Sequence, residues 1–192
     1  MPAVSVIITV LNGEATIGRA IDSALDQTFR DFEVIVVDDG SADGTAQVLR
    51  GYGNRIRVIS RPNRGLAASR NEAAAASRAR YLAFLDADDV WVRDKLHATL
   101  HALETSPEAV LAFSNAIPVD VDGTALAESS IVARHAHAPS MEDLMAARLV
   151  ILPSATVVRH TAFDAVGGFN EKFRGLGFED FHFYLLMRER GP

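Results

Sequence analysis

The 192-residue chain contains no cysteine, which excludes disulfide bonds, cysteine-ligated zinc and thiol catalysis. It has no excess of basic charge either: 19 Lys and Arg against 25 Asp and Glu give a formal net charge of −6. Nucleic acid is therefore not an expected partner. No apolar run approaches the ~18 residues that a transmembrane helix needs, and residues 1–8 lack the basic leader of a secretory signal. We expect a cytoplasmic protein.

The composition that remains is that of one globular domain. Hydrophobic residues make up 48% of the chain and charged residues 23%, a balance that allows a sizeable core. The length suits one α/β domain. We treat residues 1–192 as a single domain with a regularly patterned half, about residues 1–118, and a less regular half, about residues 119–192.

The first half alternates short β-branched apolar runs with amphipathic stretches, which is typical of βαβ units. Strands are predicted over residues 4–10, 32–37, 56–60, 81–85 and 110–115, and helices over residues 15–25, 45–52, 66–78 and 93–103. In the second half we expect a capped helix starting at residues 140–143, a strand over 155–159 and a helix over 178–190. The fold class is then α/β, with a mostly parallel central sheet between two layers of helices.

Three polar turns follow the first, second and fourth predicted strands, over residues 9–14, 38–41 and 86–89. The carboxyl ends of parallel strands line one crevice, where open α/β sheets bind ligands. The turn after the first strand is neither a GxGxxG loop nor a P-loop, so a standard dinucleotide site or NTPase is disfavoured. The three turns are predicted to form one site of another kind.

Asp86 and Asp88 directly follow a hydrophobic strand, and their i, i+2 spacing can aim both carboxylates to the same side. Carboxylate oxygens suit Mg²⁺ or Mn²⁺, which usually take one or two protein carboxylates and complete their shell with substrate phosphates. A phosphorylated ligand held through a metal is therefore expected. The plainer alternative is a solvated acidic turn, and for Asp89 we favour capping of the following helix.

Asp39 lies in a turn in which Gly40 can supply a positive φ. Such a turn needs only one acid, and a carboxylate at this strand end could accept the imino N–H of a uracil-like base or bind a ribose hydroxyl. Arg70, one turn into the next helix, could pair with an acid such as Asp39, contact the base, or be a surface residue. Glu179 and Asp180 open the last predicted helix, where acids are expected from the helix dipole alone. The functional alternative makes one of them a general base.

Taken together, residues 5–14, 36–45, 63–71, 85–89, 166–169 and 177–180 resemble the motifs of the family 2 glycosyltransferases, inverting enzymes with the GT-A fold. The resemblance covers nearly the whole chain, and six strings occur in family order. It implies that Thr9, Leu11 and Glu14 border the nucleotide, that Asp39 contacts the base and that Arg70 supports the base pocket.

The resemblance further implies that Asp86-Ala87-Asp88 is a DXD motif, with Asp86 near the ribose or metal and Asp88 ligating Mn²⁺ or Mg²⁺. Asp180 would be the catalytic base that deprotonates the acceptor hydroxyl, and Glu179 would orient the acceptor or Asp180. The implied donor is a nucleotide sugar, most simply a UDP-sugar. The implied acceptor is a saccharide, a lipid-linked saccharide or another hydroxyl, as in cell-surface polysaccharide synthesis, with peripheral association with the inner face of the membrane as an option.

Two departures from the family pattern stand out. Members often carry a second acid two residues after the Glu-Asp pair, where this chain has His182. Family catalytic domains generally continue beyond this helix, so we expect either a compact enzyme or an acceptor-binding part beyond residue 192. The QxxRW motif of processive members is absent, which gives no support for a cellulose- or hyaluronan-type polymerase. Two alternatives remain: a nucleotide-sugar-binding module without turnover, and a haloacid-dehalogenase-type phosphotransferase, whose nucleophile motif is also Asp-x-Asp.

Overall fold

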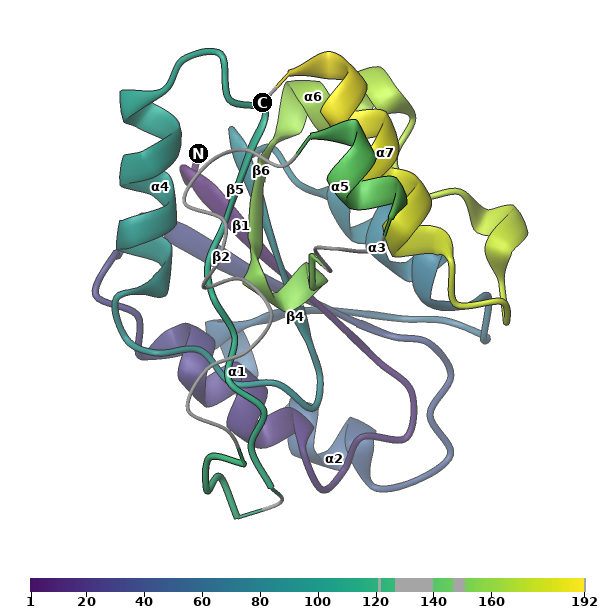
Figure 1. Cartoon of the computed structure of the whole chain (residues 1–192). Helices are drawn as coiled ribbons and strands as arrows, with labels where there is room; N and C mark the ends of the chain where they lie inside the picture. Colours follow the sequence, from purple (N-terminus) through teal and green to yellow (C-terminus); the bar gives the residue numbers. More distant parts are fainter. Residues whose placement is uncertain (121, 127–139, 147–150, 192) are drawn as a thin grey trace.

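A six-stranded sheet forms the centre of the computed structural model, which describes residues 1–120, 122–126, 140–146 and 151–191 (Figure 1). The strand order is β3-β2-β1-β4-β6-β5. The strands are β1 (Val4–Val10), β2 (Phe32–Asp38), β3 (Arg57–Ser60), β4 (Tyr81–Asp86), β5 (Leu111–Phe113) and β6 (Thr156–Arg159). Strands β1 to β4 pair with one another in parallel, whereas β6 runs antiparallel to both β4 and β5. The predicted mostly parallel sheet is confirmed.

Helices cover both faces of the sheet, as Figure 1 shows. One hydrophobic cluster joins the sheet to α1 (Ile17–Leu25), α2 (Thr45–Arg50) and α4 (Lys95–Thr105). A second cluster, on the other face, joins it to α3 (Leu66–Ala76), α5 (Met141–Met145), α6 (His160–Val166) and α7 (Glu179–Arg190). Short 3₁₀ turns lie at η1 (Gly53–Arg55), η2 (Pro153–Ala155) and η3 (Glu171–Phe173). The result is a three-layer α/β/α arrangement.

The predicted elements are present with small shifts of their ends. The helix expected from residue 140 is α5, whose capping box joins Ser140 and Asp143. The strand expected over residues 110–115 is shorter, because beyond Phe113 the chain leaves the β6 ladder. No helix among the described residues is long and apolar enough to cross a membrane.

The capping role expected of Asp89 is wrong. Helix α4 begins at Lys95 with Asp94 at its N-cap position. The backbone N–H of Asp89 instead donates to the carbonyl of Asp86 at 3.1 Å, which closes a tight turn directly after β4. Several residues therefore separate Asp89 from the helix that it was expected to cap.

The second half of the chain extends the sheet of the first half. Strand β6 pairs with β4, and η2 lies directly before β6. Helix α7 packs on the same face of the sheet as α3. This packing places the start of α7 near the carboxyl end of β4, although almost a hundred residues separate them in sequence.

Candidate functional site

The site lies at the carboxyl ends of the parallel strands. The strand register sets Thr9 opposite Asp86 and Val10 opposite Asp38. The polar turns that follow β1, β2 and β4 therefore start at one edge of the sheet, as parallel pairing requires.

The loops after β1 and β2 are joined by reciprocal hydrogen bonds. The backbone N–H of Asn12 donates to Ser41 Oγ at 2.9 Å, and Ala42 N–H donates to the Asn12 side chain at 2.8 Å. The carboxylate of Glu14 accepts a hydrogen bond from the backbone N–H of Gly44. Leu11, in contrast, leaves about half of its surface exposed beside this junction. The two loops thus form one wall, to which Glu14 contributes a structural contact.

Asp39 is almost completely buried, and its carboxylate is held by three donors. Arg61 Nε and the backbone N–H of Arg64 both donate to Oδ1 at 2.9 Å, while Gly65 N–H donates to Oδ2 at 2.7 Å. Two of these donors are backbone groups, so the carboxylate is fixed mainly by the path of the chain between β3 and α3. Sequence reasoning missed Arg61, which lies outside every motif considered.

Arg70 does not pair with Asp39, the acid suggested as its partner. Its guanidinium, 1% exposed, donates through Nη2 to Asp86 Oδ1 at 2.6 Å and through Nη1 to Asp180 Oδ1. Its Cζ atom also lies 5.1 Å from the centre of the Phe169 ring. Burial disfavours the charged form, but the neighbouring carboxylates outweigh it and raise the pKa of Arg70. The side chain is therefore a buried cation between two acids.

Asp180, in the first turn of α7, retains 30% of its side-chain exposure. Burial raises the pKa of this carboxyl above its ordinary value, and the Arg70 charge opposes the rise without cancelling it. Glu179 is a further acidic neighbour that acts in the same direction as burial. A partly exposed carboxylate of this kind binds a proton more readily than an ordinary surface aspartate.

Asp86, Ala87 and Asp88 form the turn at the end of β4. The backbone N–H of Asp86 donates to Ser154 Oγ at 2.9 Å, and Trp91 Nε1 donates to the carbonyl of Ser154 at 2.6 Å. Asp88 is exposed to solvent. Ser154 was not predicted, because only the packing of η2 brings it under this turn.

The oxygen donors here suit a divalent ion. Asp86 Oδ1 is bonded to Arg70, which leaves its second oxygen and the exposed carboxylate of Asp88 as hard donors. Among the described residues no group of three or more His, Cys, Asp or Glu side chains could hold a metal ion. Two carboxylates suffice where substrate phosphates complete the shell. A further polar atom lies at the same carboxyl end of the strands: Thr9 Oγ1 is buried and has no hydrogen-bond partner in the structure.

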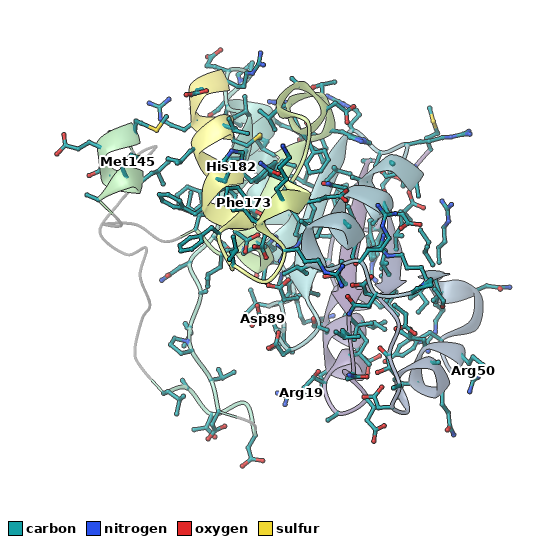
Figure 2. All side chains as sticks on the ribbon, turned by 90° about the vertical axis from the view of Figure 1, so that its right-hand side faces the viewer. Arg19, Arg50, Asp89, Met145, Phe173 and His182 are labelled. Atoms are coloured by element: carbon teal, nitrogen blue, oxygen red, sulfur yellow. The ribbon has the colours of Figure 1, made fainter. Side chains whose placement is uncertain are left out.

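His182 lies apart from the pair formed by Arg70 and Asp180. Two residues along a helix correspond to a turn of about 200°, and the His182 ring packs against Phe173, with ring centres 5.1 Å apart (Figure 2). It lines a pocket of about 350 Å³ together with Asn71, Phe169 and Leu186, among others. The ring contact of His182 is therefore with η3, in which Phe173 lies.

Comparison with known proteins decides the family. The model of "Glycosyl transferase family 2" matches residues 5–167. The chain belongs to glycosyl transferase family 2. The haloacid-dehalogenase alternative is accordingly wrong. The Asp-x-Asp motif of that family usually follows the first strand, whereas Asp86-Ala87-Asp88 follows β4.

Two curated relatives illustrate the range of this family. A chondroitin synthase of Pasteurella multocida is 30% identical over 194 residues, which span 100% of this chain but 19% of the relative. The Escherichia coli UDP-Glc:alpha-D-GlcNAc-diphosphoundecaprenol beta-1,3-glucosyltransferase WfaP is 38% identical over 121 residues, 60% of this chain and 46% of the relative. The chain therefore spans less than half the length of either relative. A hyaluronan synthase of Pasteurella multocida also matches at 30% identity, although this sequence lacks the QxxRW motif.

Solved structures with the same architecture place the chain in the GT-A fold. Staphylococcus aureus TarS 1-349 in complex with UDP-GlcNAc superposes with a TM-score of 0.73 at 24% identity, covering 97% of this chain and 53% of TarS 1-349. The mannosyltransferase PcManGT from Pyrobaculum calidifontis, in complex with GDP-Man and Mn²⁺, superposes with a TM-score of 0.67 at 20% identity, covering 95% and 50% of the two chains. At these identities the likeness concerns the fold.

Proposed function

We propose that this glycosyltransferase transfers a sugar from a UDP-sugar to an acceptor hydroxyl with inversion, that it depends on a divalent metal, and that Asp180 is its general base. The observation that carries the proposal is that the side chain of Arg70 bonds both Asp180 and Asp86. Asp180 therefore lies close to the carboxyl end of β4, where a donor diphosphate would bind. A base beside the donor is what a single displacement requires. In this proposal residues 1–192 form one catalytic domain with a nucleotide half and an acceptor half.

Asp39 binds the nucleobase in this proposal. Its carboxylate is oriented by Arg61 and two backbone N–H groups before any ligand arrives, so little further ordering is needed on binding. Oδ1 already accepts two hydrogen bonds and Oδ2 one, so the remaining lone pair of Oδ2 can accept the imino N–H of uracil. Thr9, Leu11 and Glu14 border the nucleotide, with Thr9 Oγ1 as a free hydroxyl. TarS, with bound UDP-GlcNAc, and WfaP, named for UDP-Glc, support uridine as the base.

Asp86 and Asp88 hold the divalent ion, Mn²⁺ or Mg²⁺, and Ala87 keeps the turn between them small. When bound there, the ion offsets the negative charge that develops on the departing diphosphate. The Mn²⁺ in PcManGT supports this assignment. Ser154 fixes the backbone of Asp86, so the position of the donor site depends on η2 as well as on β4.

Asp180 accepts the proton of the acceptor hydroxyl while that oxygen forms a bond to the anomeric carbon from the face opposite the leaving nucleotide. Its Oδ1 atom is bonded to Arg70, which leaves Oδ2 for the acceptor. The raised pKa of this carboxyl favours proton transfer over that of an ordinary surface aspartate. Glu179, the preceding residue on α7, orients the acceptor or Asp180.

The acceptor is a saccharide hydroxyl, and the named relatives favour one within cell-surface polysaccharide synthesis. The acceptor in the name of WfaP is linked to diphosphoundecaprenol, a lipid. A lipid-linked acceptor would bring the enzyme to the inner face of the membrane as a peripheral protein.

A screen of nucleotides and nucleotide sugars by thermal shift with Mn²⁺ tests the donor assignment. We expect stabilisation by UDP and by one UDP-sugar, and loss of that stabilisation in excess EDTA. Stronger stabilisation by GDP or dTDP would contradict the uridine assignment. Product analysis by NMR with the selected donor then tests the reaction: an anomeric configuration opposite to that of the donor is expected, and retention would refute the single displacement. UDP-sugar binding with no transfer or hydrolysis over long incubation would identify a binding module.

A further inference from the structure

Arg70 joins the carboxylates of Asp86 and Asp180 from the buried side of the site. It extends from α3, between β3 and β4 in sequence, and contacts Asp86 at the end of β4 and Asp180 at the start of α7. The 110 residues between Arg70 and Asp180 make this one of the longest-range side-chain hydrogen bonds in the described chain. The contact therefore connects the nucleotide half to the acceptor half.

The burial of Arg70 keeps it from solvent and from direct contact with a ligand in the site. Its side chain is 1% exposed, whereas those of Asp86 and Asp180 are 31% and 30% exposed. The two acids thus lie between Arg70 and solvent. Phe169 lies beside the guanidinium, with its ring centre 5.1 Å from Cζ, and restricts it further. A group in this position can act on a reaction only through the carboxylates that it holds.

Each carboxylate gives one oxygen to Arg70. Both contacts use Oδ1, one from each terminal nitrogen of the same guanidinium. Because the guanidinium is rigid and planar, the positions of the two nitrogens set the separation and orientation of the two acids. The two Oδ2 atoms are left for other partners. An unpaired charge at this depth would be costly, so the ion pairs also oppose rotation of either acid away from Arg70.

We propose that Arg70 is a positioning residue for Asp180: it fixes the general base at a set distance from the donor-site carboxylate Asp86. This inference rests on the proposed function and changes the role of Arg70 from support of the base pocket, which Arg61 performs, to alignment of the base with the donor. Alignment matters because a displacement of about 1 Å can cost about a hundredfold in rate.

The test compares Arg70→Lys and Arg70→Met with Arg159→Met. Arg159 is a partly buried arginine of β6 whose guanidinium bonds the carbonyls of Ala109 and Leu103, away from the site. For each variant we would measure kcat for transfer at saturating donor, UDP affinity by calorimetry with Mn²⁺, and melting temperature. Arg70→Lys keeps the buried charge but lacks the forked pair of nitrogens.

We expect Arg70→Lys to lower kcat by at least about tenfold and Arg70→Met by about a hundredfold, whereas the UDP dissociation constant, which reports on the contact with Asp86, should rise by a smaller factor in each variant. Arg159→Met should lower the melting temperature with kcat of the folded enzyme unchanged. If Arg70→Met does not fold, Arg70→Lys carries the test. Adding guanidinium ion to a folded Arg70→Ala variant should restore part of kcat.

Unchanged kcat in Arg70→Lys, or a loss confined to UDP affinity, would overturn the inference while leaving the glycosyltransferase assignment intact. Failure of the proposed function looks different: the unaltered protein would then show no metal-dependent UDP binding or no transfer.

Discussion

The two acids Asp39 and Asp180 are held in contrasting ways. Asp39 lies in the first half of the chain and is fixed by two backbone N–H groups and one arginine, all within 26 residues of it. Asp180 lies in the second half of the chain and is held by the side chain of Arg70, 110 residues away. Local chain geometry therefore suffices to build the end of the site that contains Asp39, the proposed base-binding end. The end that contains Asp180, the proposed catalytic end, exists only once the two halves have packed together.

This difference predicts separable effects of substitution. Changes at the nucleotide end should alter affinity, and changes at the catalytic end should alter rate. The following experiments would sharpen that distinction or remove it.

The largest effect is expected for Asp180→Asn. Loss of the general base should lower kcat by about a thousandfold, while UDP affinity stays within a few-fold because Asp180 is not part of the nucleotide contacts. Transfer assays and calorimetry measure the two quantities, and Glu189→Gln, at the exposed end of the same helix, is the matched control. A kcat within tenfold of that of the unaltered enzyme would remove Asp180 from the reaction.

Asp88→Ala should have the next largest effect. With Mn²⁺ present, UDP should bind the unaltered protein at least about tenfold more tightly than in EDTA, a difference of about 1.4 kcal/mol. In Asp88→Ala the two affinities should become equal. Asp94→Ala, at the exposed N-cap of α4, should keep the difference. A metal-independent affinity in the unaltered protein would contradict the assignment of a metal site.

Arg61→Met tests the base-binding end. A hydrogen bond to a charged group contributes about 1.5 to 3 kcal/mol, so removing the Arg61 contact to Asp39 should weaken UDP binding by about tenfold or more, with kcat at saturating donor little changed. Arg57→Met, on β3, supplies the control because the guanidinium of Arg57 bonds the Ala76 carbonyl instead. A loss of kcat equal to that of Arg70→Met would show that the two ends are not separable.

The smallest effect on activity is expected at Lys95, whose Nζ joins the halves by donating to the carbonyl of Thr156 at 3.2 Å. Burial lowers the pKa of Lys95 to about 7, below the unfolded value of about 10.4. Between these values the unfolded state binds more protons, so the free energy of unfolding rises with pH over this window.

Lys95→Met should remove that rise and increase stability at pH 7 by about 1 to 2 kcal/mol, with kcat nearly unchanged. Thermal or denaturant unfolding at pH 7 and pH 9.5 gives the comparison, with the exposed Lys172→Met as control. Lower stability of Lys95→Met at pH 7 would show that its contacts with Trp91, 4.1 Å from the ring centre, and Thr156 outweigh its desolvation.

The first half of the chain was largely predictable from sequence, because its elements follow from local pattern. Short β-branched apolar runs located β1 to β4, and apolar residues at helical spacing located the helices between them. Parallel pairing then required that the turns containing Asp39 and Asp86 share an edge. The end of β4 was less predictable: Asp89 was assigned to a helix that starts only at Lys95.

The partners of the site residues were not predictable in the same way. Arg61 and Arg70 lie nine residues apart in the sequence, and no local pattern says which of them meets Asp39. Ser154 became part of the donor site only through the pairing of β6 with β4. Each of these contacts depends on the position that a side chain takes once the helices and strands have packed together. The burial of that side chain sets the cost of leaving its charge unpaired, and burial too is known only from the packed structure.

The sequence by itself determined the order of strands and helices, the family motifs and the placement of Asp39, Asp86 and Asp88 at one edge, because these follow from residue periodicity and from the geometry of parallel strands. Only the tertiary structure decided that Arg61 holds Asp39 and that Arg70 joins Asp86 to Asp180. The physical reason is that a buried guanidinium pairs with the carboxylates that packing brings next to it, and the local spacing of residues in the sequence does not specify which carboxylates those are.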